Sequence, residues 1–336
     1  MEAIDLVALT RALVDIDSTT GREGDVGRFL AGFLRSAGFT VAEQPVDATR
    51  FNIVATVDEP SVMLSTHLDC VPPFFSSRLE GDRLFGRGAC DAKGILAAQV
   101  VAADRLRRAG ETRVGLLFVV GEERGSDGAR VANDHAIAAC RFLVDGEPTD
   151  NRLGLATRGV LRARLKAVGR AAHSSFPELG VSAIDKLIDA LMTLRAIELP
   201  SDPELGTTHY TVGIISGGVA ANVISPSATA ELMFRTVGEA STVRDALVAL
   251  ESHVQVEYVR EAPTVRLTTV PGFDRAVFPY TTDIPFLSRW GEPLLFGPGS
   301  IHVAHTADEF ISVAELTAGV DHYVTIATKL LERTLR

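Results

Sequence analysis

The chain has 336 residues, of which 46% are hydrophobic and 23% charged. This length exceeds what one hydrophobic core usually serves, so two domains are expected, and the composition excludes wholesale disorder. A formal net charge of −10 argues against nucleic-acid binding, which requires a basic surface.

The three cysteines, Cys70, Cys90 and Cys140, are not closely spaced. They indicate a reducing compartment and not a disulfide framework. Residues 1–18 contain acidic residues and lack a basic segment followed by a long apolar one, so no signal peptide is expected. No apolar run approaches the roughly 20 residues of a membrane helix. We therefore expect a cytoplasmic protein with no membrane or nucleic-acid partner.

In the first half of the chain, strand patterns alternate with helical patterns. Apolar residues recur at helical spacing in residues 4–16 and 24–37. A further helix is predicted at residues 94–109. Short apolar runs typical of strands lie at residues 51–57, 62–66, 114–120 and 141–144. This alternation predicts an α/β sheet covered by helices on both faces.

The pattern changes near residue 158, where residues 160–168 alternate apolar and basic side chains like a half-exposed strand. After Pro271 the α/β pattern returns. Between residue 158 and Pro271, helices are predicted at 182–196 and 241–252, and strands near 209–215, 228–236 and 254–260. After Pro271, a strand is predicted at 293–297 and a helix at 313–333. We predict a catalytic domain in two segments, residues 1–158 and 269–336, with an α+β domain of residues 159–268 inserted between them.

Histidine and acidic residues follow several of the predicted strands directly. They are His67 and Asp69, Glu122 and Glu123, Asp145 and Glu147, and finally His302 and His305, with Asp91 in the glycine-rich segment 86–94. Ligands of an open α/β sheet bind beyond the carboxyl ends of its strands. A single group of histidine and acidic residues after a strand is usually a surface feature. The coincidence of four such groups predicts a metal site. Imidazoles and carboxylates without thiolates suit Zn²⁺, Mn²⁺ or Co²⁺.

Five motifs stand in the order found in the M20 family of metallopeptidases and related deacylases. They are HLDCVP at 67–72, GRGACDAKG at 86–94, GEE at 121–123, GEPT at 146–149 and GPGSIHVAHTADE at 297–309. The chain resembles this family over essentially its whole length. The resemblance implies a two-metal catalytic domain, a mixed sheet flanked by helices, with an inserted lid and dimerisation domain.

The resemblance also implies a role for each residue of the centre. Two divalent cations, Zn²⁺ first with Co²⁺ or Mn²⁺ as alternatives, would share Asp91. His67 and Glu147 would complete one metal, and Glu123 and His305 the other. Asp69 would orient His67, and Glu122 would act as the general base. Asp145 remains the alternative to Glu147, and a cis peptide bond is expected at Asp91–Ala92.

In the inserted domain the resemblance points to three residues. His173 would reach the active site of a partner subunit in a homodimer, with a structural histidine as the alternative. Asn222 would hydrogen-bond the substrate. Arg235 would bind a substrate carboxylate, unless it forms an ordinary ion pair on the sheet. Gly299, in the segment 297–300, is expected to lie at the substrate.

The segments 280–287, 296–301 and 304–310 most resemble acetylornithine deacetylases and N-acyl-lysine hydrolases. The expected substrate is therefore an N-acyl amino acid with a free carboxylate, and the alternative is a short peptide cleaved by a di- or aminopeptidase. The loop 71–77 looks abbreviated, which leaves the substrate open. A non-catalytic relative would lack Glu122 or Asp91. The sequence also lacks the Gly-x-Gly-x-x-Gly and Gly-x-Ser-x-Gly motifs of nucleotide-binding proteins and serine hydrolases.

Overall fold

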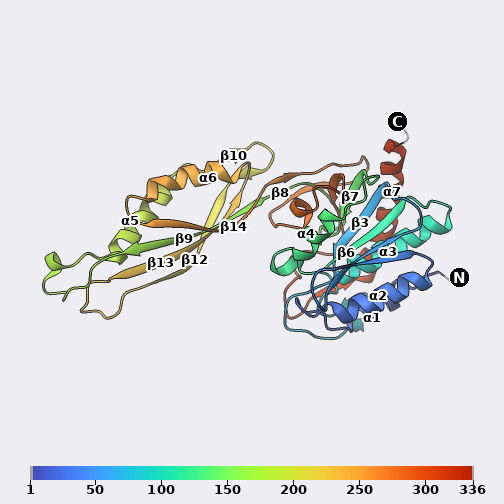
Figure 1. Cartoon of the computed structure of the whole chain (residues 1–336), viewed down its shortest axis with the longest axis horizontal. Coiled ribbons are helices and arrows are strands. Elements are labelled where there is room, and N and C mark those ends of the chain that lie inside the picture. The colour runs from blue at the N-terminus through green and yellow to red at the C-terminus, as the bar shows by residue number, and fades with distance from the viewer. Residues whose placement is uncertain (1–2, 335–336) are drawn as a thin grey trace. The chain divides into compact units, whose positions relative to one another are not determined.

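The computed structural model describes residues 3–334 (Figure 1). The chain forms two compact units, which we call unit 1 and unit 2. Unit 1 contains the residues up to Leu155, Leu267–Ala276 and the residues from Thr282 onward, and unit 2 contains Ala156–Arg266 and Val277–Thr281. The predicted catalytic segment 269–336 includes residues 277–281, which belong instead to unit 2. The reason is that Val277 packs on a small apolar cluster of that unit, formed by Ala156, Leu205 and Val237.

A mixed six-stranded sheet forms the centre of unit 1, in the order β1-β2-β6-β3-β7-β17. The last four strands run parallel to one another, whereas β1 and β2 are antiparallel to their neighbours. All residues of β3 and β6 are buried, as their continuous apolar runs predict for the middle of such a sheet. The strands are β1 (Thr40–Pro45), β2 (Phe51–Thr56), β3 (Val62–His67), β6 (Val114–Val119), β7 (Phe142–Asp145) and β17 (Glu292–Leu295).

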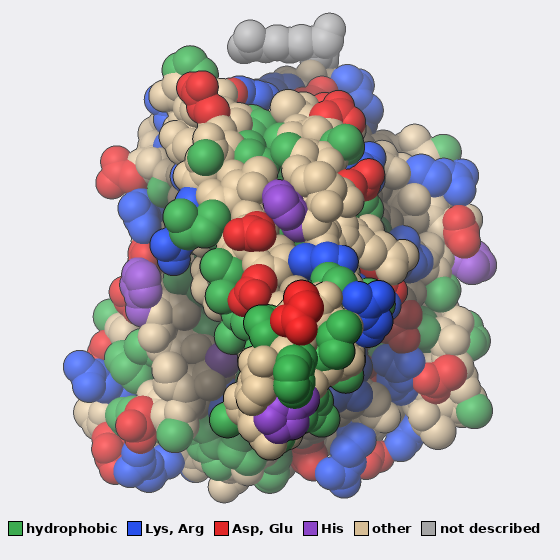
Figure 2. All heavy atoms as spheres, turned by 90° about the vertical axis from the view of Figure 1, so that its left-hand side faces the viewer, with side chains coloured by type: hydrophobic (Ala, Val, Ile, Leu, Met, Phe, Trp, Pro, Cys, Tyr) green, Lys and Arg blue, Asp and Glu red, His purple; other side chains and the backbone are tan. Residues whose placement is uncertain are grey.

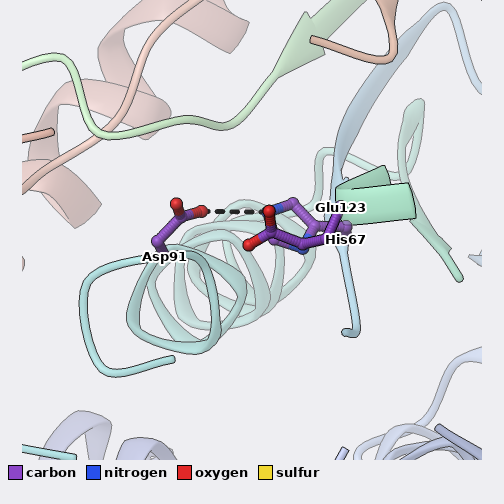
Figure 3. Close-up of side chains that lie close together, drawn as sticks. All are labelled: His67, Asp91 and Glu123. Carbon is purple, nitrogen blue, oxygen red and sulfur yellow. Dashed lines mark hydrogen bonds and ion pairs between the residues drawn. The ribbon is translucent and has the colours of Figure 1, made fainter. Parts of the chain in front are cut away.

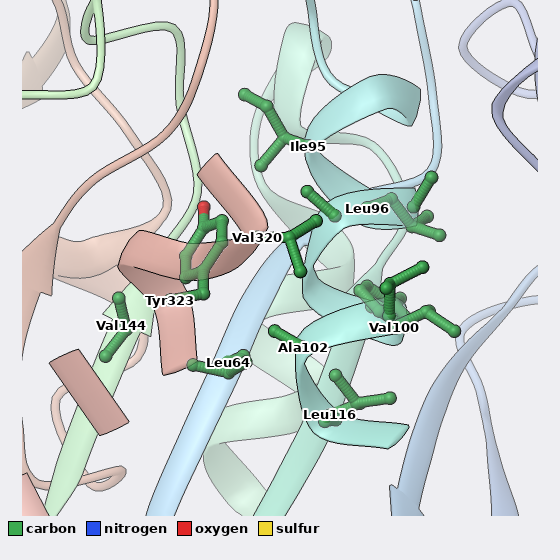
Figure 4. Packing of buried hydrophobic residues seen from close by; sticks show 14 of the residues in the cluster. Leu64, Ile95, Leu96, Val100, Ala102, Leu116, Val144, Val320 and Tyr323 are labelled. Carbon is green, nitrogen blue, oxygen red and sulfur yellow. The ribbon is translucent and has the colours of Figure 1, made fainter. Parts of the chain in front are cut away.

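Helices cover both faces of this sheet. On one face, Leu64 of β3 and Leu116 of β6 pack in one buried cluster with Val100 and Val320 of two helices (Figure 4). On the other face a short helix with Ala129 and Ala132 packs near the buried Trp290. The first face carries α1 (Leu6–Val14), α2 (Gly24–Ser36), α3 (Lys93–Arg108) and α7 (Val313–Thr334), and the second carries α4 (Asp127–Asp134).

The chain also forms two three-stranded sheets. One has the order β18-β5-β4, and its register places Phe310 opposite Phe85. This pairing brings the segment after Phe85, which leads to Asp91, beside the segment that precedes Phe310. The strands are β4 (Arg78–Glu80), β5 (Arg83–Phe85) and β18 (Phe310–Ser312), and those of the other sheet are β8 (Leu153–Thr157), β15 (Val265–Arg266) and β16 (Arg275–Phe278).

Unit 2 is built on an antiparallel four-stranded sheet in the order β12-β13-β9-β14. Two helices bury the alternate apolar residues of one face, as in Leu161 and Phe234. The other face is polar, and Arg162 and Arg164 both pair with Glu231 there. The elements are β9 (Gly159–Val168), α5 (Ala183–Ala196), β12 (His209–Gly217), β13 (Ser227–Thr236), α6 (Ala240–Leu247) and β14 (Gln255–Ala262), with a hairpin of β10 (Ser201–Asp202) and β11 (Gly206–Thr207).

The predicted α/β architecture with an inserted α+β part is therefore confirmed. The sequence analysis missed β1, whose residues are mostly exposed and polar, and α4, which contains few large apolar residues. Among the described residues, no helix combines the length and the apolar character that crossing a membrane requires.

Candidate metal centre

The candidate ligands lie where the parallel strands of unit 1 end. His67 is the last residue of β3, and the single turn Glu122–Arg124 follows β6. Glu147 comes two residues after β7, and His305 lies in the loop between β17 and β18. Because these strands are parallel neighbours, their carboxyl ends meet at one edge of the sheet. Asp91 reaches the same place from the segment that leads into α3, and the Asp91–Ala92 peptide bond is cis, as the resemblance implied.

Asp91 lies between two imidazoles. Its Oδ1 is 3.0 Å from His67 Nε2, and its Oδ2 is 3.2 Å from His305 Nε2. His305 Nε2 also lies 2.9 Å from Glu123 Oε1. Figure 3 shows His67, Asp91 and Glu123 converging, and one ligand atom from each lies within 4.8 Å of the others. Asp91 thus offers one oxygen to each histidine, which is the arrangement of a bridging carboxylate.

Asp69 is fully buried and organises two neighbouring parts of the centre. Its Oδ1 and Oδ2 accept the backbone N–H groups of Glu122 and Glu123 at 3.1 and 3.2 Å, and Oδ2 also accepts the Thr20 hydroxyl at 2.8 Å. The Nδ1 atom of His67 lies 3.0 Å from the Asp69 carbonyl oxygen and 3.4 Å from Oδ1. Donation from Nδ1 leaves Nε2 of His67 available to a cation, so Asp69 orients His67 and also holds the turn that carries Glu122.

The histidines of the centre are held in a strongly negative environment. Burial disfavours the charged form of His67, yet hydrogen bonds with Asp69 and Asp91 raise its pKa. Hydrogen bonds with Asp91 and Glu123 raise the pKa of His305 to about 10. The carboxylates of the cluster therefore favour positive charge at both imidazoles. Divalent cations would supply the same charge through the same nitrogen and oxygen atoms, so the residues present fit a metal centre.

Glu122 is a partly buried carboxylate of a different kind. Burial raises its pKa, with a further contribution from the negative charge of Asp283. Its backbone N–H is held by Asp69, whereas the carboxylate makes no hydrogen bond within residues 3–334. A carboxylate that stays uncommitted while its neighbours are engaged is suited to proton transfer.

Glu147 and Asp145 were left as alternative ligands by the sequence, and their surroundings differ. Burial raises the pKa of Glu147, and the next cause is the charge of Asp91. Burial also raises the pKa of Asp145, to about 8, but there the next cause is Asp283. Asp91 is thus the neighbouring charge that acts most on Glu147, and Asp283 is the one that acts most on Asp145. Glu147 stays the expected ligand.

The candidate residues of unit 2 do not gather in one place. The segment with His173 lies beside the segment with Asn222, because Ser174 N–H donates to the Asn222 carbonyl at 3.0 Å. Both side chains are exposed. Arg235 is half-buried near the opposite end of β13, where burial and the charge of Arg260 lower its pKa. No ion pair of Arg235 occurs within residues 3–334, so the structure gives no support to the alternative of an ordinary sheet ion pair.

Gly299 has a packing role in unit 1. Its φ of +85° lies in the left-handed region, and a Cβ atom there would come within 2.7 Å of Cys90 Sγ. The residue thereby lets the loop with His305 approach the segment with Asp91. His302, which had no role in the resemblance, is exposed.

The sequence analysis assigned no role to three buried charged residues near the centre. Arg87 and Glu309 form an ion pair in which both side chains are 1% exposed. Asp283 adds negative charge behind Glu122. Arg87 and Glu309 lie within two of the motifs that resemble the M20 family, and this position could have identified them from the sequence. Asp283 followed no predicted strand and lay in no motif, so no signal pointed to it.

Comparison with known proteins gives a consistent result. The model of peptidase family M20/M25/M40 matches residues 63–329. A probable carboxypeptidase of Aspergillus terreus is 39% identical over 373 aligned residues, which cover 97% of this chain and 85% of that protein. A peptidase M20 domain-containing protein of Schizosaccharomyces pombe is 37% identical, with 95% and 83% of the two chains covered.

Among solved structures, a tripeptidase from Staphylococcus aureus matches with a TM-score of 0.82 and 19% identity. The match covers 98% of this chain and all of that one. At this identity the likeness concerns the fold. The names of these relatives refer to peptidases and not to the deacetylases that the sequence motifs favoured.

Proposed function

This chain belongs to peptidase family M20/M25/M40 and is a metal-dependent hydrolase, and from this premise we propose that it removes the C-terminal residue from short peptides. The observation that carries the proposal is the 39% identity to a probable carboxypeptidase along 97% of this chain. The sequence analysis favoured an N-acyl amino acid as substrate and kept short peptides as the alternative. The relatives support the alternative better.

The centre would hold two divalent cations. His67 and Glu147 would complete one, Glu123 and His305 the other, and Asp91 would be shared by both. When bound, the cations would polarise the scissile carbonyl and increase the acidity of water. The identity of the metal follows from none of these contacts, and Zn²⁺, Co²⁺ and Mn²⁺ all accept such ligands.

The residues of the chain would perform the proton transfers. The uncommitted carboxylate of Glu122 would take a proton from the attacking water as the carbonyl carbon becomes tetrahedral. It would then return that proton to the amide nitrogen, so that the amine leaves in neutral form. Asp69 would keep Glu122 in place through its backbone N–H and would keep His67 in the tautomer with Nε2 free.

Arg235 would bind the carboxylate next to the scissile bond. Its guanidinium is half-buried, has a cationic neighbour in Arg260 and has no acidic partner in the described chain, so a carboxylate would relieve its charge. A peptide with a free C-terminus and an N-acyl amino acid share this end group. Hydrolysis of N-acyl amino acids is therefore the second candidate, and the half-buried guanidinium of Arg235 beside Arg260 is the observation that favours it.

We also propose that the chain works as a homodimer. The 10 residues of β13 span roughly 30 Å, with Arg235 near one end and the segments of His173 and Asn222 beyond the other. No dipeptide could contact both ends of one copy. If His173 and Arg235 serve the same substrate, they must come from different copies.

The surface of unit 2 supports such an assembly. Ile184, Ile188 and Met192 repeat every four residues on α5, and the exposed fraction of their side chains rises from 37% to 59%. Ile214 and Ile215 are exposed on β12, which is an edge strand of the sheet. Figure 2 shows that hydrophobic side chains lie exposed among charged ones on one face of the molecule. A second copy could cover the apolar stripe formed by Ile184, Ile188 and Met192 and could pair with the free edge of β12.

Hydrolysis of a matched substrate panel tests the proposed activity. Metal-reconstituted protein would receive tripeptides with a free C-terminus, the same tripeptides as C-terminal amides, and N-acetyl amino acids. Release of the last residue from the free tripeptides alone supports the carboxypeptidase. Turnover of only the N-acetyl compounds would move the function to the second candidate, and turnover of the amides would contradict carboxylate recognition.

A further inference from the structure

Arg87 and Glu309 form a fully enclosed ion pair in unit 1. Arg87 Nη1 donates to Glu309 Oε2 over 2.6 Å, and each side chain is 1% exposed. A buried pair contributes little net stability, because removing both charges from water offsets their attraction. A role in positioning other groups accounts better for its presence.

The contacts of Glu309 lead directly to the bridging carboxylate. Its Oε1 accepts the backbone N–H groups of Cys90 and Asp91, each at 3.0 Å. Its carbonyl oxygen accepts the N–H of Gly86 at 3.1 Å. One residue therefore holds both ends of the segment 86–91, which ends on Asp91.

The contacts of Arg87 fix the pair to a third segment. Its Nε donates to the Pro73 carbonyl at 3.1 Å, and its backbone N–H donates to the Phe75 carbonyl at 3.1 Å. The guanidinium also lies 5.1 Å from the centre of the Phe75 ring. These contacts define the direction from which Arg87 approaches Glu309.

Glu309 also ends the loop that carries His305. The pairing of β18 with β5 fixes Glu309 beside Gly86, and the Cys90 thiol donates to the Ser300 carbonyl at 3.4 Å. The segment with Asp91 and the loop with His305 are thus joined at both ends of the loop. Asp91 Oδ2 and His305 Nε2, 3.2 Å apart, belong to the two segments joined in this way.

We propose that Arg87 and Glu309 act as a positioning pair that sets the separation between Asp91 and His305, and thereby the affinity of the centre for the cation those residues share. This inference rests on the proposed function, because it requires that the centre binds cations. Neither residue touches the substrate or the reacting atoms. Their effect passes through the backbone of Asp91.

The charge of Glu309 is essential to this arrangement. In Glu309→Gln, one side-chain oxygen could still accept from Cys90 and Asp91, but the amide NH₂ would then face the Arg87 donors. Turning the amide over would instead place NH₂ against the two backbone N–H groups. Either choice sets donor against donor, so the segment must shift. Arg87→Lys retains the charge but cannot reach Glu309 and Pro73 with one planar fork, so it should have an intermediate effect.

Metal binding to the full-length chain tests the proposal. Metal-free protein is titrated with Zn²⁺ by calorimetry in the presence of a competing chelator. The wild type should bind two ions, and His305→Ala identifies the one that depends on His305. In Glu309→Gln the affinity for that same ion should fall roughly 10- to 100-fold, the usual effect of losing a partner behind the ligands. Glu309→Gln added to His305→Ala should cause little further loss.

The matched control is Asp104→Asn, which removes another buried carboxylate paired with arginines, on α3. It should lower the thermal midpoint of the metal-free protein without changing Zn²⁺ affinity. Unchanged affinity in Glu309→Gln, or equal loss in Asp104→Asn, would overturn the positioning role while leaving the proposed function intact. A wild type that binds no cation would overturn both. If Glu309→Gln fails to fold, Arg87→Lys should show a smaller loss of the same ion, and unchanged affinity there overturns the proposal.

Discussion

The two units of this chain place their candidate residues in opposite ways. In unit 1, residues far apart in the sequence meet at one edge of a parallel sheet, and Asp91 lies within 3.2 Å of both histidines. In unit 2, His173 and Arg235 lie toward opposite ends of β13, and no bond within the described chain joins them. The first arrangement forms within one copy, whereas the second would need a partner if His173 and Arg235 serve one substrate as proposed. Catalytic chemistry should therefore depend on unit 1, and substrate selection and assembly on unit 2.

The largest effect that this division predicts comes from Glu122. In Glu122→Gln the carboxylate that transfers the proton is lost while the volume is kept, so kcat should fall roughly 10²- to 10⁴-fold. The metal content, measured on the same sample, should stay at the wild-type value. Glu178→Gln, an exposed change in unit 2, is the control and should keep full activity. A Glu122→Gln enzyme with normal kcat would remove the base from the mechanism.

A smaller and more selective effect is expected from Arg235 in unit 2. Arg235→Met should raise KM for peptides with a free C-terminus by roughly 10- to 100-fold, since a charged hydrogen-bonded partner of the carboxylate is lost. Steady-state kinetics should show a much smaller change in kcat. Arg260→Met tests whether its neighbour shares this role. An unchanged KM in Arg235→Met would contradict carboxylate binding by this residue.

Assembly can be separated from chemistry on the surface of unit 2. The double change Ile188→Asp with Ile215→Asp places charges in the exposed apolar stripe and on the free edge of β12, so the dimer should dissociate. Sedimentation analysis measures the mass, and activity is assayed at the same concentration. If His173 acts in the partner's site, the monomer should lose activity and keep its metal.

Val259→Asp is the matched control, because it changes an exposed residue of β14, the opposite edge of the same sheet. It should leave the mass unchanged. A wild-type protein that is already monomeric and fully active would end the proposal that a partner contributes to the site.

The smallest effect concerns stability. Removing cations with a chelator should lower the free energy of unfolding of unit 1, by about 2.7 kcal/mol where the metal had been present at 100 times its Kd. Unit 2 contributes none of the proposed ligands, so its unfolding should shift little. Hydrogen exchange on β3 and β13 separates the two units. Equal loss of protection in both strands would contradict the assignment of the metals to unit 1.

The sequence predicted the parts of this molecule that depend on local patterns. The apolar runs of β3 and β6 and the periodicity of α3 and α7 are regular enough to be recognised. The meeting of His67 and Glu123 was also predictable, because both follow strands of the parallel sheet and parallel strands end together. The edge strand β1 and the short α4 lack such patterns and are held by tertiary contacts.

Residues whose contacts are set only by the folded chain escaped prediction. Glu309 meets Asp91 through the pairing of β18 with β5, which join segments more than two hundred residues apart. Asp283, whose charge contributes to the raised pKa of Glu122, lies in a loop where no strand end had been predicted. The choice between peptides and N-acyl amino acids also escaped prediction, because both kinds of substrate carry a free carboxylate.

The central claim is that Asp91 is shared by two cations in unit 1, and a metal titration of Asp91→Asn tests it most directly. Zn²⁺ is added to the metal-free wild type and to Asp91→Asn, and the bound ions are counted by calorimetry. The account predicts two ions in the wild type, with both weakened far beyond 100-fold in Asp91→Asn, since Asp91 contacts both histidines. Loss of only one ion, or retention of both at normal affinity, would contradict the shared carboxylate.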